Sequence, residues 1–368
     1  MKKIMMVFGT RPEAVKMCPL VLEMKKHSDI DCKICLTGQH REMIWQVMKT
    51  FGIREDYNLD IMREHQTLTT ITSSVLEKMQ PVLYESKPDI VLVHGDTSTS
   101  FAAALAAFYQ KISVGHVEAG LRTGNIYSPY PEELNRLLIG RMAAFHFAPT
   151  KQNAENLKKE NIKNNIFITG NTVIDAFKTT VTENYKFNNS VLQDLDYIND
   201  RIILVTAHRR ENLGEPLEQI CKAIWRLTKA YPDTVVIYPV HLNPAVRETV
   251  YRFLDNNMQI KLVEPLDVSD MHNLMARCFM VMTDSGGLQE EAPFFGKPVL
   301  VMRKETERME AVEAGTAKLA GVKEEDIFEM ASELLNNPQK YSDMAKAVNP
   351  YGDGYASKRI IKILEEYM

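Results

Sequence analysis

Short apolar segments alternate along this chain with longer segments in which apolar residues recur at helical spacing. A strand buried in a parallel sheet is apolar on both faces, whereas a helix that covers the sheet is apolar on one face. The alternation therefore predicts βαβ units and a parallel sheet. In the first half of the chain, strands are expected at residues 3–8, 32–37, 89–94, 113–117, 145–148 and 166–169.

The same pattern starts again after a polar stretch at residues 186–200. Further strands are expected at residues 202–206, 235–239, 260–263, 279–283 and 298–301. A chain of 368 residues also exceeds the usual size of one domain, roughly 100–200 residues. We therefore expect an α/β protein with two doubly wound Rossmann-like domains, residues 1–170 and 171–350, and a ligand cleft between them.

Composition narrows the classes of partner. The formal net charge is −4, from 44 basic and 48 acidic residues, so no nucleic acid or anionic membrane surface is expected to bind. Apolar segments stay well below the roughly 20 residues that span a bilayer, which favours a cytoplasmic protein. The five cysteines are scattered, and Cys32 and Cys35 lie three apart on an expected strand, where they point to opposite faces. A redox or metal role for them is disfavoured.

Ligands of doubly wound folds bind beyond the carboxyl ends of the strands. Polar segments follow the expected strands at residues 9–13, 38–42, 94–97, 116–122, 207–211, 239–241 and 284–291. The segment Asp284-Ser-Gly-Gly287 would let backbone N–H groups approach a phosphate at a helix N-terminus. A plain strand-to-helix turn capped by Asp284 or Ser285 is the alternative. Neither a GxGxxG fingerprint nor zincin histidine spacing is present, so we expect no dinucleotide cofactor and no catalytic metal.

Several charged residues lie at or near these strand ends. Arginine and lysine suit phosphate oxygens, whereas carboxylates and histidine suit proton transfer. The candidates are Arg11, Lys16, Asp96, Glu118, Arg122, Glu132, His208, Arg209 and Arg308. Together they predict acid/base chemistry on a phosphorylated ligand, although each alone fits a solvated charge or a structural ion pair. Glu132 and Glu133 could simply open a helix at residues 133–143, and His94 or His116 could be a satisfied strand-end histidine.

A series of motifs resembles the non-hydrolysing UDP-N-acetylglucosamine 2-epimerases, in order from the first strand to the last helix. The motifs are Gly9-Thr-Arg-Pro-Glu-Ala14, Gln39-His-Arg-Glu-Met43, Val93-His-Gly-Asp-Thr97, Gly115-His-Val-Glu-Ala-Gly-Leu-Arg-Thr123, Ser128-Pro-Tyr-Pro-Glu-Glu133, Ile168-Thr-Gly-Asn-Thr-Val-Ile-Asp175, Thr206-Ala-His-Arg-Arg-Glu-Asn212, Thr283-Asp-Ser-Gly-Gly-Leu-Gln-Glu-Glu-Ala-Pro293 and Asn349-Pro-Tyr-Gly-Asp-Gly354. The resemblance implies a glycosyltransferase-B-like fold, with UDP on the second domain and a last helix, residues 351–368, that packs back on the first.

The resemblance also implies an activity and its residues. The activity is the interconversion of UDP-N-acetylglucosamine and UDP-N-acetylmannosamine through elimination of UDP, without a cofactor, in a homodimer. The implied acid/base group is Asp96, Glu118, Glu132 and His208. The implied UDP-binding residues are Arg11, Lys16, Ser285, Gly286, Glu291 and Arg308. In some members a second substrate molecule activates the enzyme, and the corresponding positions are Gln39, His40, Arg209 and His241.

Three positions depart from the family pattern. Met309 replaces a proline next to Arg308, Met271 replaces a frequent phenylalanine beside uracil, and Glu42 stands where some activated members have glutamine. At position 271, methionine can cover a ring face but lacks aromatic stacking, and at position 309 the loss of the proline ring leaves the loop of Arg308 less restricted, so both changes bear on nucleotide affinity. Glu42 bears on the activator positions instead. Three alternatives stay open on the sequence: a hydrolysing epimerase, a glycosyltransferase of the same architecture, and a catalytically silent UDP-sugar sensor.

Overall fold

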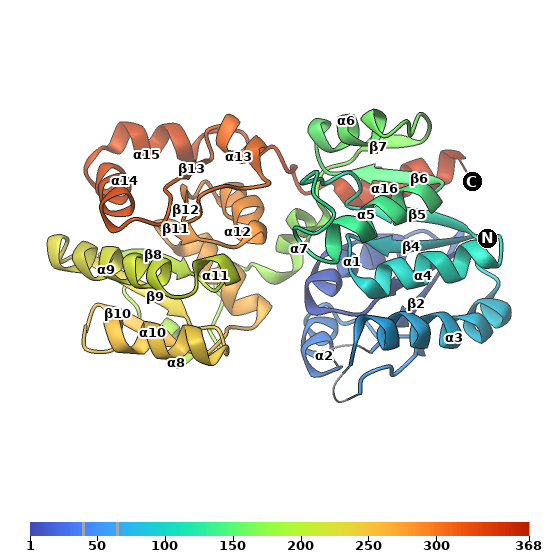
Figure 1. Ribbon diagram of the computed structural model, residues 1–368, viewed down its shortest axis with the longest axis horizontal. Coiled ribbons are helices and arrows are strands. Elements are labelled where there is room, and N and C mark those ends of the chain that lie inside the picture. The colour runs from blue at the N-terminus through green and yellow to red at the C-terminus, as the bar shows by residue number, and fades with distance from the viewer. Residues whose placement is uncertain (39–40, 64–65, 368) are drawn as a thin grey trace. The chain divides into compact units, whose positions relative to one another are not determined.

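The computed structural model describes residues 1–38, 41–63 and 66–367. The chain forms two compact units, Met1–Thr180 with Tyr351–Met368 and Val181–Pro350. The division falls after Thr180 rather than at residue 170, because α7 (Thr172–Thr180) packs against α1 (Arg11–Met24). Each unit is a sheet flanked by helices (Figure 1).

The sheet of the first unit is parallel throughout, with strand order β3-β2-β1-β4-β5-β6-β7 among the described residues. Its strands are β1 (Lys2–Phe8), β2 (Ile30–Leu36), β3 (Tyr57–Asn58), β4 (Ile90–His94), β5 (Ser113–Val117), β6 (Phe145–Ala148) and β7 (Ile166–Ile168). Besides α1 and α7, its helices are α2 (Arg41–Thr50), α3 (Leu68–Ser86), α4 (Ser98–Tyr109), α5 (Glu132–Met142), α6 (Lys151–Lys159) and α16 (Ala356–Tyr367).

The centre of this sheet is packed on both faces, which is why its strands read as continuous apolar runs. Every residue of β4 is buried, and β4 lies between β1 and β5. Helix α4 is rich in buried alanines, and these small side chains let it lie close to α3. The carboxyl ends of β1, β4 and β5 are therefore held side by side at the middle of the sheet.

The second unit repeats the architecture with strand order β10-β9-β8-β11-β12-β13. Its strands are β8 (Arg201–Thr206), β9 (Thr234–Pro239), β10 (Ile260–Val263), β11 (Met280–Thr283), β12 (Val299–Val301) and β13 (Ala317–Leu319). Its helices are α8 (Ser190–Gln193), α9 (Glu215–Ala230), α10 (Pro244–Leu254), α11 (Val268–Arg277), α12 (Gly286–Glu291), α13 (Met309–Glu313), α14 (Glu324–Asn336) and α15 (Pro338–Ala345), with 3-10 turns η1 (Arg210–Asn212) and η2 (Ala292–Phe295).

The predicted fold class, two Rossmann-like α/β sheets, is confirmed. Each expected strand is present, with ends shifted by no more than one or two residues. The helix expected at residues 133–143 begins at Glu132 and ends at Met142. Two short strands, β3 and β13, were not predicted. No helix in the described part of the chain is both long and apolar enough to cross a bilayer.

The last helix, α16, belongs to the first unit and packs on α1 and α7. At its start, the Asp175 carboxylate on α7 accepts hydrogen bonds from the backbone N–H groups of Ala356 and Ser357, at 3.1 and 3.0 Å. These bonds satisfy N–H groups that a helix start otherwise leaves unpaired. The chain thus returns to the first unit through a capped helix.

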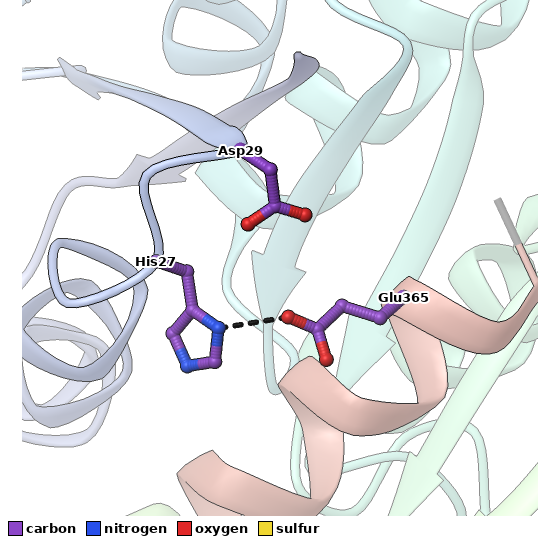
Figure 2. Close-up of side chains that lie close together, drawn as sticks. All are labelled: His27, Asp29 and Glu365. Carbon is purple, nitrogen blue, oxygen red and sulfur yellow. Dashed lines mark ion pairs between the residues drawn. The ribbon is translucent and has the colours of Figure 1, made fainter.

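A polar cluster lies at the other end of α16. His27, Asp29 and Glu365 place their ligand atoms within 4.8 Å of one another, and they are the one such trio found in residues 1–38, 41–63 and 66–367. His27 Nδ1 faces Glu365 Oε1 at 2.7 Å (Figure 2). Both carboxylates are exposed, and the Lys2 ammonium donates to the Glu365 carbonyl at 2.6 Å. We interpret the cluster as an ion pair that fixes the end of α16.

Candidate active site

Glu118 follows β5 and lies in a buried ionic cluster of the first unit. Lys16 Nζ of α1 lies 2.8 and 2.6 Å from its two carboxylate oxygens. His94 Nε2, at the end of β4, lies 2.5 Å from Oε2. The ring is not aligned for a straight hydrogen bond, but so short a separation is favourable only with a proton between the atoms. The cluster therefore joins α1 to the carboxyl ends of the neighbouring strands β4 and β5.

The environment of Glu118 favours its ionised form. Burial alone would raise the pKa of this carboxyl, but the charges of Lys16 and His94 outweigh burial and hold the pKa well below its ordinary value. The backbone of Glu118 has φ of +64°, a left-handed conformation that is costly for a residue with a Cβ. Such strain persists where surrounding contacts fix the residue, and it concentrates at functional sites.

Asp96 lies one turn beyond β4 and is bound by Arg136 of α5. Arg136 Nε and Nη2 lie 2.8 and 2.7 Å from Asp96 Oδ2. Arg136 Nη1 also donates to Glu133 Oε2 at 2.8 Å, and Glu133 Oε1 accepts the backbone N–H groups of Thr123 and Gly124. Glu133 is thus a structural clamp, whereas Asp96 is the more exposed of the two carboxyls and lies just after the end of β4.

Glu132, next to that clamp, has a different environment. It is the first residue of α5 and is half-buried. Its Oε2 atom is buried and has no hydrogen-bond partner within the described residues. A buried polar atom without a partner is rare, and it invites a functional explanation. Glu118 and Asp96 are each in an ion pair, with Lys16 and Arg136 respectively. No ion pair of Glu132 is found among the described residues, so its protonation would break none.

Glu13 is a buried residue of this region that the sequence did not single out. Its Oε2 accepts the backbone N–H groups of Gly9 and Thr10, at 2.9 and 2.7 Å. Its Oε1 accepts the hydroxyl groups of Thr97 and Ser100, both at 2.6 Å. Glu13 therefore ties the loop after β1 to the start of α4, and the Thr10–Glu13 capping-box spacing was the available signal.

The two candidate arginines of the first unit, Arg11 and Arg122, differ in position. Arg122 makes a bidentate ion pair with Glu160, at 2.6 and 3.0 Å, and is almost buried. It therefore fits the structural interpretation rather than a ligand contact. Arg11 is half-buried at the first position of α1, directly after the glycine turn that ends β1.

In the second unit, Asp284 organises the loop that carries His208. Asp284 is fully buried, and its Oδ2 accepts the backbone N–H groups of His208 and Arg209, both at 2.7 Å. Oδ2 also accepts the Asn212 side-chain amide at 3.1 Å. Tyr238 donates its hydroxyl to the Ala207 carbonyl at 2.8 Å. The backbone at His208 and on both sides of it is thus fixed by buried polar groups.

His208 is held where it can accept a proton. Burial lowers the pKa of His208 below its ordinary value, and the charge of Asp284 offsets this only in part. Its Nδ1 lies 3.6 Å from Asp284 Oδ1, and its ring stacks on that of His241 with centroids 5.0 Å apart. His208 is therefore mainly neutral at pH 7, which suits a proton acceptor or a hydrogen-bond donor to phosphate.

The loop after β11 meets Arg308 at Gly286. A Cβ at Gly286 would come within 2.6 Å of Arg308 Cζ, so glycine is needed for this close approach. Arg308 Nε donates to Glu290 at 2.9 Å, and Nη1 pairs with Glu307. Since α12 has only six residues, its dipole is small, and the charge of Arg308 is the stronger attraction for an anion.

Other predicted nucleotide positions lie nearby in the same unit. Glu291 lies at the end of α12, where its Oε2 is 3.6 Å from His272 Nε2. Met271, next to that histidine on α11, is half-buried. Ser285 caps the start of α12, although its hydroxyl makes no capping bond. Met309 is the first residue of α13 and is 47% exposed, a helix position that proline would tolerate.

The predicted activator positions are only partly described. Gln39 and His40 lie outside the described residues. Arg209 and His241 are in the second unit, where Arg209 Nη2 lies 3.7 Å from Glu307 Oε1 and His241 stacks on His208. The four positions therefore cannot be assembled into one site from the described residues.

Known proteins resemble this chain over its full length. The profile described as UDP-N-acetylglucosamine 2-epimerase matches residues 22–365. The UDP-N-acetylglucosamine 2-epimerase of Bacillus subtilis (strain 168) is 56% identical over 363 residues, 98% of this chain and 94% of that protein. The solved structure of UDP-GlcNAc 2-epimerase from Neisseria meningitidis bound to UDP-GlcNAc is 47% identical, with a TM-score of 0.92, and the match covers 99% of this chain and 100% of that one.

A more distant likeness bears on the fold alone. The solved structure of the glycotransferase of kitacinnamycin has a TM-score of 0.66 at 11% identity, over 99% of this chain and 98% of that chain. Two parallel sheets with polar, charged strand ends place the protein in the glycosyltransferase-B-like class. Within that class, the chain belongs to the UDP-N-acetylglucosamine 2-epimerase family.

Proposed function

We propose that this protein interconverts UDP-N-acetylglucosamine and UDP-N-acetylmannosamine without releasing free sugar. The observation that carries the proposal is the full-length match to an epimerase whose solved structure holds UDP-GlcNAc, at 47% identity. The chemistry of the strand ends supports it, because buried carboxylates and a neutral histidine can move a proton.

The proposed route is elimination followed by re-addition. A base removes the carbon 2 proton, the electrons of that C–H bond form the C1=C2 double bond, and the C1–O bond breaks as UDP leaves with its electron pair. A second group then protonates carbon 2 of the resulting 2-acetamidoglucal on the opposite face while UDP adds back to carbon 1. We assign the proton transfers to Asp96, Glu118, Glu132 and His208.

The departing diphosphate needs cationic and hydrogen-bonding partners. We assign UDP binding to Arg11, Lys16, Ser285, Gly286, Glu291 and Arg308. Arg308 is supported by its close packing on Gly286, next to the backbone N–H groups of the β11–α12 loop. Lys16 is supported less directly, because in this structure it pairs with Glu118.

The test is incubation of the purified protein with UDP-N-acetylglucosamine in deuterated water, followed by proton NMR of the anomeric and carbon 2 signals. A new UDP-N-acetylmannosamine signal, with deuterium at carbon 2 of both product and recovered substrate, is the expected result. Epimerisation without deuterium exchange would contradict the elimination route.

The same spectra separate the alternatives. A hydrolysing epimerase would release free N-acetylmannosamine and UDP, and a glycosyltransferase would give a product only when an acceptor is added. A silent sensor would bind UDP-sugar and leave it unchanged. Three further points stay predictions: that a second substrate molecule activates the protein, that it forms a homodimer, and that it is located in the cytoplasm.

A further inference from the structure

We propose that His94 is a positioning residue of this reaction, which acts with Lys16 to hold the Glu118 carboxylate ionised and in place for proton removal. The inference rests on the proposed epimerase activity and adds a residue that the acid/base group above does not contain. From the sequence, a satisfied strand-end histidine was one interpretation of His94.

The first support is geometric. Lys16 of α1 approaches both oxygens of Glu118, and His94 of β4 approaches Oε2 from a second element. The side chains of all three residues are no more than 13% exposed. Burial of this kind strengthens each charge contact, because little water competes with it. The carboxylate is therefore held from two directions on a strained residue.

The second support is the arrangement of the loop that carries His94. His94 and Glu118 end neighbouring strands, with His94 paired in register to Val117. His116 on β5 has its Nε2 2.7 Å from the Gly95 carbonyl, which can only accept, so this nitrogen carries the proton. Burial lowers the pKa of His116 to about 3, so its ring is neutral and contributes no charge to Glu118 at pH 7. His116 thus fixes the backbone next to His94.

The charged groups around Glu118 make its direction of titration clear. Lys16 faces it from α1 and His94 from β4, and the nearby Asp96 is neutralised by Arg136 of α5. With both partners present, the pKa of Glu118 lies well below its ordinary range, although burial opposes this. Loss of either partner raises the pKa of Glu118. As the pH falls, the ionised carboxylate that accepts the proton is then lost at a higher pH than in the parent.

The experiment compares the pH dependence of kcat/KM in the parent, His94→Met and His94→Gln. Methionine fills the space without a donor, whereas glutamine keeps an N–H near the position of Nε2. We expect the acid limb of the kcat/KM profile to lie at least about one pH unit higher in His94→Met than in the parent. At a pH below both limbs, kcat/KM of the variant is then about tenfold lower than that of the parent. The limb of His94→Gln should lie between the two, and UDP affinity should be unchanged in both.

His146→Gln is the matched control. His146 is a buried histidine on β6 of the same sheet, outside the cluster, and burial lowers its pKa to about 4. Its replacement should leave the acid limb where the parent has it, even if the melting temperature falls. If His94→Met does not fold, His94→Gln carries the test, because it also removes the imidazole that faces Glu118 Oε2.

The outcomes are distinct. A parent that does not epimerise would contradict the proposed function itself. A parent that epimerises while His94→Met keeps its acid limb would overturn the role of His94. An upward shift of the basic limb, with faster turnover at neutral pH, would also overturn it, because Glu118 would then act as an acid.

Discussion

Asp284 and His208 are joined through the backbone as well as through their side chains: Asp284 Oδ2 accepts the His208 N–H at 2.7 Å, and Oδ1 lies 3.6 Å from His208 Nδ1. A single buried carboxylate therefore fixes the backbone of the loop through Oδ2, while its Oδ1, which has no hydrogen-bond partner among the described residues, lies beside the imidazole. The residue that the sequence offered as a helix cap is instead the anchor of a candidate catalytic group.

Asp284→Ala should destabilise the protein and slow it. The change leaves the N–H groups of His208 and Arg209 without their acceptor, and each orphaned buried donor costs about 1–3 kcal/mol. We expect a loss of at least about 2 kcal/mol in urea unfolding, with a lower kcat in the fraction that stays folded. As a control, Asp175→Ala also removes a buried acceptor of two backbone N–H groups, and it should lower stability while kcat stays near the parent value.

Glu118→Gln and Glu132→Gln should each lower kcat by roughly 10²–10⁴-fold, because a positioned proton-transfer group is lost. Both substitutions nearly preserve shape, so UDP affinity measured by calorimetry should change little. Glu160→Gln is the comparison, since Glu160 pairs with Arg122 outside the cluster. Parent-like turnover in both glutamine variants would return Glu118 to a structural ion pair and Glu132 to the first turn of α5.

The strands were predictable because a strand buried on both faces is a continuous apolar run, as in β11. The strands β3 and β13 escaped prediction because two or three residues at a sheet edge carry no pattern. Glu118 and Asp96 were identifiable from motifs at strand ends. Arg136 was not, since it lies within α5 and acquires its role through contact with a residue 40 positions away.

The ion-pair group around Glu307 should make stability depend on pH. Burial raises the pKa of Glu307, but the charges of Arg308 and Arg303 outweigh burial. The pKa is therefore lowered from an ordinary value of 4.5 to about 2. A depressed pKa contributes stability above the unfolded value and loses it as the pH falls from about 4.5 towards 2, by up to about 3 kcal/mol. Glu307→Gln should flatten this part of the curve in urea unfolding at pH 3–7. Glu264→Gln, at an exposed ion pair, should leave the curve unchanged.

Arg308→Ala should weaken UDP binding by roughly 10- to 150-fold, the equivalent of a charge-assisted hydrogen bond of about 1.5–3 kcal/mol. Gly286→Ala should weaken binding in the same direction but less, because its Cβ would come within 2.6 Å of Arg308 Cζ and displace a flexible side-chain end. Arg303→Ala is the matched control, since Arg303 pairs with the same Glu307 but has no assigned contact with UDP. Titration with UDP and thermal melting of all three variants separate affinity from stability. The contrary outcome is that Arg308→Ala and Arg303→Ala both bind UDP as tightly as the parent. Arg308 would then be a structural partner of Glu290 and Glu307, and other residues would have to bind the diphosphate.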